Sequence, residues 1–173
     1  MGRGCMMRYL SVLLVVVFGF LGQQAVGQQL SRQEKLEADR ARVEADGRWI
    51  YNDLAKGFAT AKETNKPMMV VLRCVPCEEC VKLDDELVER NADIRRLMDS
   101  FICVRQVFTN GLDLKTFQFD TDQSFAVFFL NGDGTIYGRF GTRSHRTEWL
   151  GDVSVEAMAE AMNAALHQFF TRL

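Results

Sequence analysis

Apolar residues along the chain gather in short runs that are separated by stretches of helical periodicity. An apolar run of about five residues is too short for a helix and is typical of a strand buried on both faces of a sheet. The sequence Asn131–Gly134 is typical of a tight hairpin turn, so a further strand is expected directly after it. The predicted strands are residues 68–72, 101–108, 125–130 and 135–140.

Helical periodicity occupies most of the remaining domain. Asn52 or Asp53 is suited to cap one helix and Ser154 another, since short polar side chains satisfy the free N–H groups of a first turn. The helix that follows Pro76 has apolar positions at Val81, Leu83, Leu87 and Val88. The predicted helices are residues 53–64, 77–88, 93–98 and 155–169.

The order of these elements is helix, strand, helix, strand, hairpin, helix. Strands that are joined through helices run parallel with right-handed crossovers, whereas a hairpin adds an antiparallel strand at the edge. We therefore expect an α/β fold, a three-layer sandwich with a central mixed sheet of about four to five strands and helices on both faces. Its core is expected to include Val70, Val71, Leu72, Val104, Val127 and Phe129.

The first 27 residues have the pattern of a secretory signal peptide. Arg3 and Arg8 precede an apolar core, and the small residues of Ala25-Val26-Gly27 precede the expected cleavage site. The apolar core is shorter than the roughly 20 residues of a spanning helix, although a retained membrane anchor is the alternative. We expect an exported protein, periplasmic or secreted, with a signal peptide at 1–27, a polar helical spacer at 28–48 and one domain at 49–173.

Three cysteines, Cys74, Cys77 and Cys80, stand where the 68–72 strand gives way to a helix. The first turn of a helix has unsatisfied N–H groups and a partial positive charge, which stabilise a thiolate relative to a thiol. This placement predicts a nucleophilic cysteine in an exported chain, where disulfide chemistry is possible.

The chain from about Trp49 to Phe170 resembles the thioredoxin superfamily, in particular exported domains of the thiol:disulfide interchange type. The resemblance rests on Lys66-Pro67, the buried strand, the Cys-x-x-Cys pair and its amphipathic helix, and on Phe-Phe-Leu-Asn-Gly-Asp-Gly before the hairpin. It implies that Cys77 attacks a substrate disulfide and Cys80 resolves the mixed disulfide, with Cys74 as an additional thiol. It also implies protein substrates, another thiol protein as electron donor, and no bound cofactor.

The sequence departs from that family at three positions. Pro76 replaces the usual tryptophan before the first cysteine, and Val71 stands where a buried acid often assists proton transfer. The family's cis-proline is missing, with Ser124 or Phe125 at its position. Because cis bonds without proline cost about 2.5–4 kcal/mol, the substrate-docking loop is expected to have a different shape.

Charges near the cysteine pair bear on its redox potential. Glu78 and Glu79 lie between the two cysteines and disfavour a thiolate, which shifts the couple toward reducing potentials. The sequence therefore predicts a reductase or disulfide carrier. Arg105, expected on the neighbouring strand, either offsets part of this acidity or is an exposed residue at a strand end.

Three other interpretations of the cysteines stay open: a static Cys77–Cys80 disulfide, a metal site, and a redox-silent interaction module. Cys74, Cys77 and Cys80 match the start of an iron–sulfur run, but Asp84 stands where its fourth cysteine is expected. Zinc would need a fourth ligand such as Cys103 or a histidine.

The remaining candidates have simpler interpretations. Cys103 lies in an apolar strand and is expected to be an inert core residue. His145 is expected in a solvated loop and His167 on a partly exposed helix face, while Phe125 is the one phenylalanine considered for peptide docking.

Composition limits the partners. The formal net charge of −2 gives no support to nucleic-acid binding. We expect a monomer that acts on exported protein thiols and disulfides, with no membrane association after signal cleavage.

Overall fold

The computed structural model describes residues 30–73, 75, 81, 84–118, 125–142 and 154–172. The expected signal segment, 1–27, lies outside them. Within the described residues, no helix is both long enough and apolar enough to span a bilayer.

A five-stranded mixed sheet forms the centre of the domain, in the order β1-β3-β2-β4-β5. β2 pairs in parallel with β3, and β3 in parallel with β1, whereas β4 runs antiparallel to β2 and β5 antiparallel to β4. This arrangement confirms the predicted mixed sheet and its antiparallel hairpin edge. The strands are β1 (Trp49–Tyr51), β2 (Met68–Arg73), β3 (Ile102–Gln106), β4 (Phe125–Leu130) and β5 (Ile136–Thr142).

Two helices begin at polar caps that the sequence indicates. Asp53 and Ser154 accept hydrogen bonds from backbone N–H groups of α3 and α6, and Asn91, which was not identified from the sequence, caps α5 in the same way. Val81 and Asp84 are helical, and a π-helical turn, η2, follows them in place of the regular helix end that was predicted. The bounds are α2 (Arg32–Asp46), α3 (Leu54–Thr64), η2 (Asp85–Glu89), α5 (Ala92–Met98) and α6 (Val155–Thr171).

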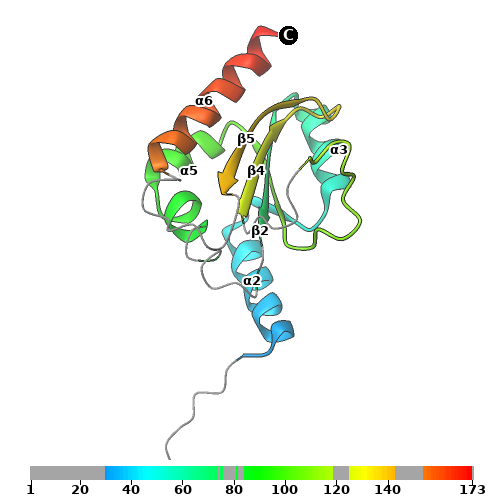
Figure 1. Cartoon of the computed structure of the whole chain (residues 1–173), viewed down its shortest axis with the longest axis vertical. Coiled ribbons are helices and arrows are strands. Elements are labelled where there is room, and N and C mark those ends of the chain that lie inside the picture. The colour runs from blue at the N-terminus through cyan, green and yellow to red at the C-terminus, as the bar shows by residue number, and fades with distance from the viewer. Residues whose placement is uncertain are drawn as a thin grey trace, which may run out of the picture. The chain divides into compact units, whose positions relative to one another are not determined.

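Two apolar cores lie on opposite faces of the sheet, and β2 contributes alternate residues to each. Met68, Val70 and Leu72 pack on the side of α3, while Met69 and Val71 pack on the side of α5 and α6. Figure 1 shows α3 on one side of the strands and α5 and α6 on the other. The six core residues predicted from sequence are all buried: Val70, Val71, Leu72, Val104, Val127 and Phe129.

The polar stretch before the domain forms α2, with a capping box between Ser31 and Glu34 and a left-handed Gly47 at its end. Helix formation and its end at Gly47 agree with the expectation from sequence. One side of this helix, however, is not solvated, because Asp39 and Val43 are buried against the domain. A spacer without contacts would leave both side chains exposed, so α2 packs as part of the fold.

Candidate active site

The predicted reactive segment begins where β2 ends. Arg73 is the last residue of the strand and Cys74 follows it. Cys74, Cys77 and Cys80 all lie outside the described residues. What the structure describes are the flanks of this segment: Arg73 and Val75 on one side, Val81 and Asp84 on the other.

Arg73 is a charged residue in a strand that is otherwise apolar and buried. Its side chain has no solvent exposure, and its guanidinium donates to the Asp39 carboxylate of α2. Its Nε also lies 3.3 Å from Oδ2 of Asp84, which is equally buried. The strand thus ends in a cation held between two carboxylates from different parts of the chain.

Arg105 of β3 supplies the second buried cation. Its Nη2 lies 3.0 Å from Asp84 and 2.6 Å from Oε1 of Glu89. The guanidinium carbon lies 4.2 Å from the centre of the Trp49 ring, a cation–π contact. The interpretation of Arg105 as an exposed strand-end residue is therefore wrong, since its side chain has 0% solvent exposure.

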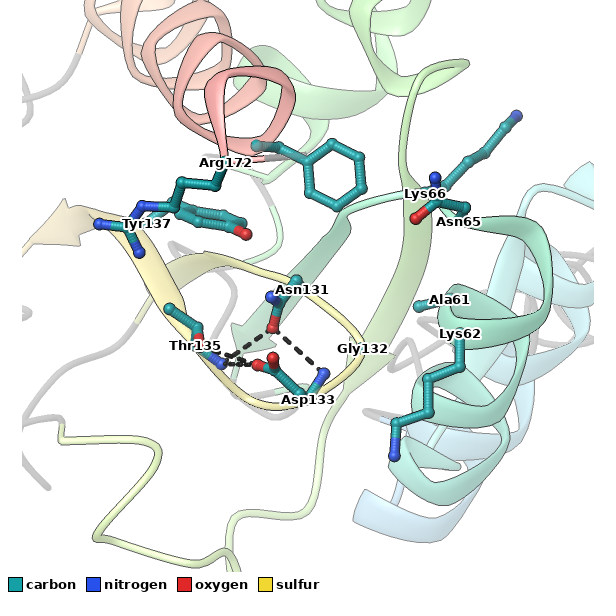
Figure 2. A pocket seen from close by; sticks show the side chains of 11 residues that line it. Ala61, Lys62, Asn65, Lys66, Asn131, Gly132, Asp133, Thr135, Tyr137 and Arg172 are labelled. Carbon is teal, nitrogen blue, oxygen red and sulfur yellow. Dashed lines mark hydrogen bonds between the residues drawn. The ribbon is translucent and has the colours of Figure 1, made fainter.

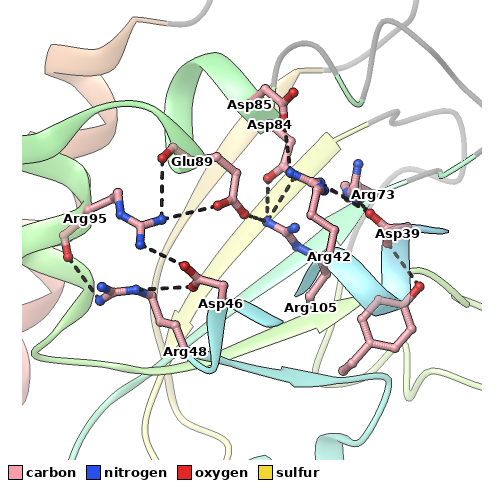
Figure 3. Close-up of polar contacts among 11 residues, drawn as sticks. Asp39, Arg42, Asp46, Arg48, Arg73, Asp84, Asp85, Glu89, Arg95 and Arg105 are labelled. Carbon is pink, nitrogen blue, oxygen red and sulfur yellow. Dashed lines mark hydrogen bonds and ion pairs between the residues drawn. The ribbon is translucent and has the colours of Figure 1, made fainter. Parts of the chain in front are cut away.

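Asp84 is the acceptor that the two arginines share. Burial raises the pKa of its carboxyl, while the nearby charges of Arg105 and Arg73 oppose that rise. We refer to Asp39, Arg73, Asp84, Glu89 and Arg105 as the buried ion-pair network (Figure 3). Two cations face three carboxylates here, so charge is nearly balanced within the protein interior.

Residues of α2 and β1 that are only partly buried make further contacts with the network. Tyr51 donates a hydrogen bond to Asp39 at 3.0 Å, and burial together with the Asp39 charge raises the pKa of this phenol. Arg42 reaches both Asp39 at 3.4 Å and Asp85 at 3.0 Å. These contacts connect α2 with the π-helical turn that follows the cysteine segment (Figure 3).

A second set of ion pairs anchors the end of α2 to α5. Asp46 accepts a hydrogen bond from Arg95 at 2.8 Å, which lowers the pKa of the Asp46 carboxyl. Arg95 also contacts Glu89 at 3.4 Å. Asp46 is therefore linked to the buried ion-pair network through Arg95 and Glu89.

Sequence reasoning did not identify Asp39, Arg73 or Asp84 as functional candidates. Asp39 lies in the stretch 28–48, which the sequence predicted only as a polar helical spacer. The apolar run that predicted the strand ends at Leu72, so the pattern gave no signal that Arg73 is buried, and only the tertiary structure places it in the interior. A buried charge is costly unless it is paired, so such a residue indicates a buried partner elsewhere in the chain.

The structure settles several of the simpler candidates. Cys103 is buried in β3, which confirms its predicted place in the core, and burial raises the pKa of its thiol to about 12. Phe125 has 0% exposure and faces Arg73 in the pairing of β4 with β2, so its suggested role in peptide docking is wrong. His167 is exposed on α6, and His145 lies outside the described residues.

The described residues contain no group of three or more histidine, cysteine or acidic side chains arranged to hold a metal ion. The cysteine cluster considered for metal binding lies outside them and is not tested by this result.

Among the described residues, clefts open at opposite ends of the sheet. One, of about 440 Å³, lies beside the hairpin turn, where Asn131 accepts hydrogen bonds from the N–H groups of Asp133 and Thr135 (Figure 2). Because Lys66 in its lining precedes β2, this cleft is at the end of the sheet away from Arg73. The other, of about 410 Å³, is lined by Leu36, Tyr51 and Phe108 among others, at the carboxyl ends of β1 and β3.

The chain is similar to one protein family and to a solved structure. Residues 48–132 match a family described as thioredoxin-like, and the match includes β2 and the three cysteines. The disulphide isomerase from Xylella fastidiosa Temecula1 is similar over 64% of this chain and 86% of its own, with 23% sequence identity and a TM-score of 0.46. No curated protein matches the chain.

Proposed function

Because residues 48–132 form a thioredoxin-like domain, we propose that this protein is an exported thiol–disulfide oxidoreductase acting on protein disulfides through Cys77 and Cys80. The observation that carries the proposal is a Cys-Glu-Glu-Cys sequence four residues after the end of β2, the central strand of that domain. In a thioredoxin-like domain, a cysteine pair in this position is suited to reversible exchange.

The exchange conserves thiols and electrons. The Cys77 thiolate attacks one sulfur of a substrate disulfide, forms a mixed disulfide and displaces the other substrate sulfur as a thiolate, which takes up a proton. The Cys80 thiolate then attacks the Cys77 sulfur and releases the second substrate thiol. Two electrons pass from the protein dithiol to the substrate, leaving a Cys77–Cys80 disulfide that another thiol protein must reduce.

The charges near the pair favour reduction of substrates. Glu78 and Glu79 oppose thiolate formation, and a dithiol with less acidic thiols is the stronger reductant. We therefore assign the protein a role as reductase or disulfide carrier.

Trapping tests this proposal. In the Cys80→Ser variant, a mixed disulfide on Cys77 cannot be resolved, so a small disulfide-bonded model protein should stay attached until a reductant releases it. The Cys77→Ser/Cys80→Ser variant is the matched control and should hold none.

The alternative, a module that holds a metal or a fixed bridge, predicts different results for the same samples. Stoichiometric metal that is lost with Cys80, without any trapped protein, would contradict the exchange reaction. So would a Cys77–Cys80 bridge that does not equilibrate with glutathione. Resolution that persists in Cys80→Ser and stops in Cys74→Ser/Cys80→Ser would make Cys74 the partner of Cys77.

A further inference from the structure

One face of α2 carries charged residues at positions where a docked helix usually carries apolar ones. The residues that pair with the domain or are buried against it are spaced i, i+3, i+4 and i+7, so they lie on one side of the helix. Three of the four are charged, and the fourth, Val43, is buried. The four residues are Asp39, Arg42, Val43 and Asp46. The attachment of α2 therefore depends mainly on ion pairs.

The partners of these charged residues belong to four different elements. Asp39 accepts a hydrogen bond from Tyr51 at 3.0 Å in addition to its pair with Arg73. The ion pair of Arg42 measures 3.0 Å and that of Asp46 measures 2.8 Å (Figure 3). The partners are Tyr51 of β1, Arg73 of β2, Asp85 of η2 and Arg95 of α5. These contacts join α2 to elements that are distant from one another in the sequence.

Contacts within α2 also stabilise its helical form. The capping box of Ser31 and Glu34 satisfies N–H groups at its start. Arg40 pairs with Glu44 at 2.8 Å, one turn apart on the exposed side. Gly47, with a φ of +69°, ends the helix and leads directly to β1. The helix is therefore suited to leave the domain as one unit, with the residues around Gly47 as the hinge.

We propose that α2 is a strap, which ion pairs hold on the domain and which opens as a unit while the sheet stays folded. Opening breaks these pairs but uncovers one buried apolar side chain of the helix, Val43, whereas unfolding of the sheet would expose both apolar cores. The open strap leaves Arg73 with Asp84 as its acidic partner and gives water access to its guanidinium. Because α2 precedes residues 48–132, the strap is an addition to the thioredoxin-like domain, and its opening does not require the proposed exchange activity.

Asp46 distinguishes the attachment of α2 from the stability of the helix itself. It lies in the last turn, where the partial negative charge of a helix C-terminus disfavours an acid. Asp46→Asn therefore stabilises the isolated helix while it removes the ion pair with Arg95. A helix that only frays would exchange its backbone hydrogens more slowly in this variant, whereas a strap held by charge would open more often. Glu44 is the matched control, because it lies in the same turn but pairs with Arg40 of α2 itself.

Hydrogen–deuterium exchange of the full chain, followed by mass spectrometry, tests the strap. Peptides that cover residues 32–46 report on α2, and peptides that cover residues 68–73 report on the sheet. In the wild type we expect α2 to exchange at least about tenfold faster than β2, because a partial opening costs less than global unfolding. Asp46→Asn should accelerate the exchange of α2 by about two- to fivefold and leave β2 unchanged, whereas Glu44→Gln should change neither.

Arg95→Gln tests the same ion pair from the side of the domain. It should also accelerate the exchange of α2, and Asp46→Asn/Arg95→Gln should open α2 no more often than Arg95→Gln alone, since the pair is already broken. Unchanged or slower exchange of α2 in Asp46→Asn would overturn the proposal, as would fully additive acceleration in the double variant. Exchange of α2 at the rate of β2 in the wild type, equal acceleration of β2 in Asp46→Asn, or loss of folding in that variant would overturn it too, because each would show that α2 opens only with the whole domain.

Discussion

The Nε atom of Arg73 lies 3.3 Å from Oδ2 of Asp84, with neither side chain exposed to solvent. These two residues are the nearest described ones in the chain, together with Val75 and Val81, to the cysteines of the proposed site. Arg105 approaches the same carboxylate to 3.0 Å from the neighbouring strand. Asp84 is therefore a buried acid that two cations share at the edge of the sheet where the cysteine segment begins, and Asp39 and Glu89 supply the further negative charge.

Removing the Asp84 charge should be strongly destabilising. The Asp84→Asn variant leaves Arg73 and Arg105 buried with one carboxylate fewer, and breaking a buried pair from one side costs about 3–5 kcal/mol. We expect a fall of this size in the free energy of unfolding, measured by urea denaturation.

Asp93→Asn is the control for this change. Asp93 pairs with Arg96 at 3.2 Å, but both side chains are about three-quarters exposed. An exposed pair contributes about 0–1 kcal/mol, so this variant should unfold close to the wild type. A comparable loss in both variants would show that burial of Asp84 is not the cause.

The two glutamates between Cys77 and Cys80 should set the reduction potential. Glu78→Gln/Glu79→Gln removes two negative charges beside the thiols, which lowers the thiol pKa and makes the couple more oxidising. Equilibration with glutathione buffers measures the potential of both proteins. A wild-type potential near the value of about −120 mV for DsbA, or a shift in the opposite direction, would contradict the assignment as a reductase.

Cys103 should be unreactive in the folded protein. Because burial raises the pKa of its thiol to about 12, it remains protonated at pH 8.5 and is shielded from reagents. Alkylation followed by mass mapping should modify Cys103 only after unfolding in urea. Modification at the same rate in native and unfolded protein would contradict the buried position.

The same thiol should make stability depend on alkaline pH. An unfolded-state cysteine loses its proton near the ordinary value of 9.0, whereas the folded one keeps it up to about 12. Between these values the native state binds more protons, so the stabilisation that is complete below pH 9 decreases as pH rises. The Cys103→Ala variant should show a smaller decrease over this range in urea denaturation.

A side chain at Gly57 of α3 is expected to be destabilising. A Cβ at this position would lie 2.6 Å from Cγ2 of Val104 and 2.9 Å from Cε of Met68. Overpacking costs about 1–3 kcal/mol, against about 1 kcal/mol gained in helix propensity, so Gly57→Ala should lower the free energy of unfolding by about 1 kcal/mol.

A second substitution isolates the cause. Val104→Ala removes the methyl groups that the new Cβ meets, so Gly57→Ala should be less destabilising in that background than in the wild type. Additive losses in the double variant would show that the contact with Val104 is not responsible.

Local patterns were sufficient for most of the architecture. The run at 125–130 predicted β4 without error, Ser154 was correctly identified as the cap of α6, and the helical connection before β3 correctly implied its parallel pairing with β2. β1 was not predicted, because its three residues form a strand only by pairing with β3. The π-helical turn η2 was not predicted either, because the spacing of the apolar residues in this helix does not indicate it.

Hydrophobic periodicity and turn chemistry are properties of neighbouring residues, so the order of the strands β2 to β5 and of the helices between and after them, the two faces of β2 and the cysteine pair after it could be derived from the chain alone. The pairing of charges could not, because an acid on a polar helix has the same local sequence whether it faces water or a buried arginine. Only the folded protein brings Asp39, Arg73, Asp84 and Arg105 together from four segments. A charged side chain can be buried without a large free-energy cost only when its charged partners are buried beside it. The tertiary structure therefore decided this part of the site.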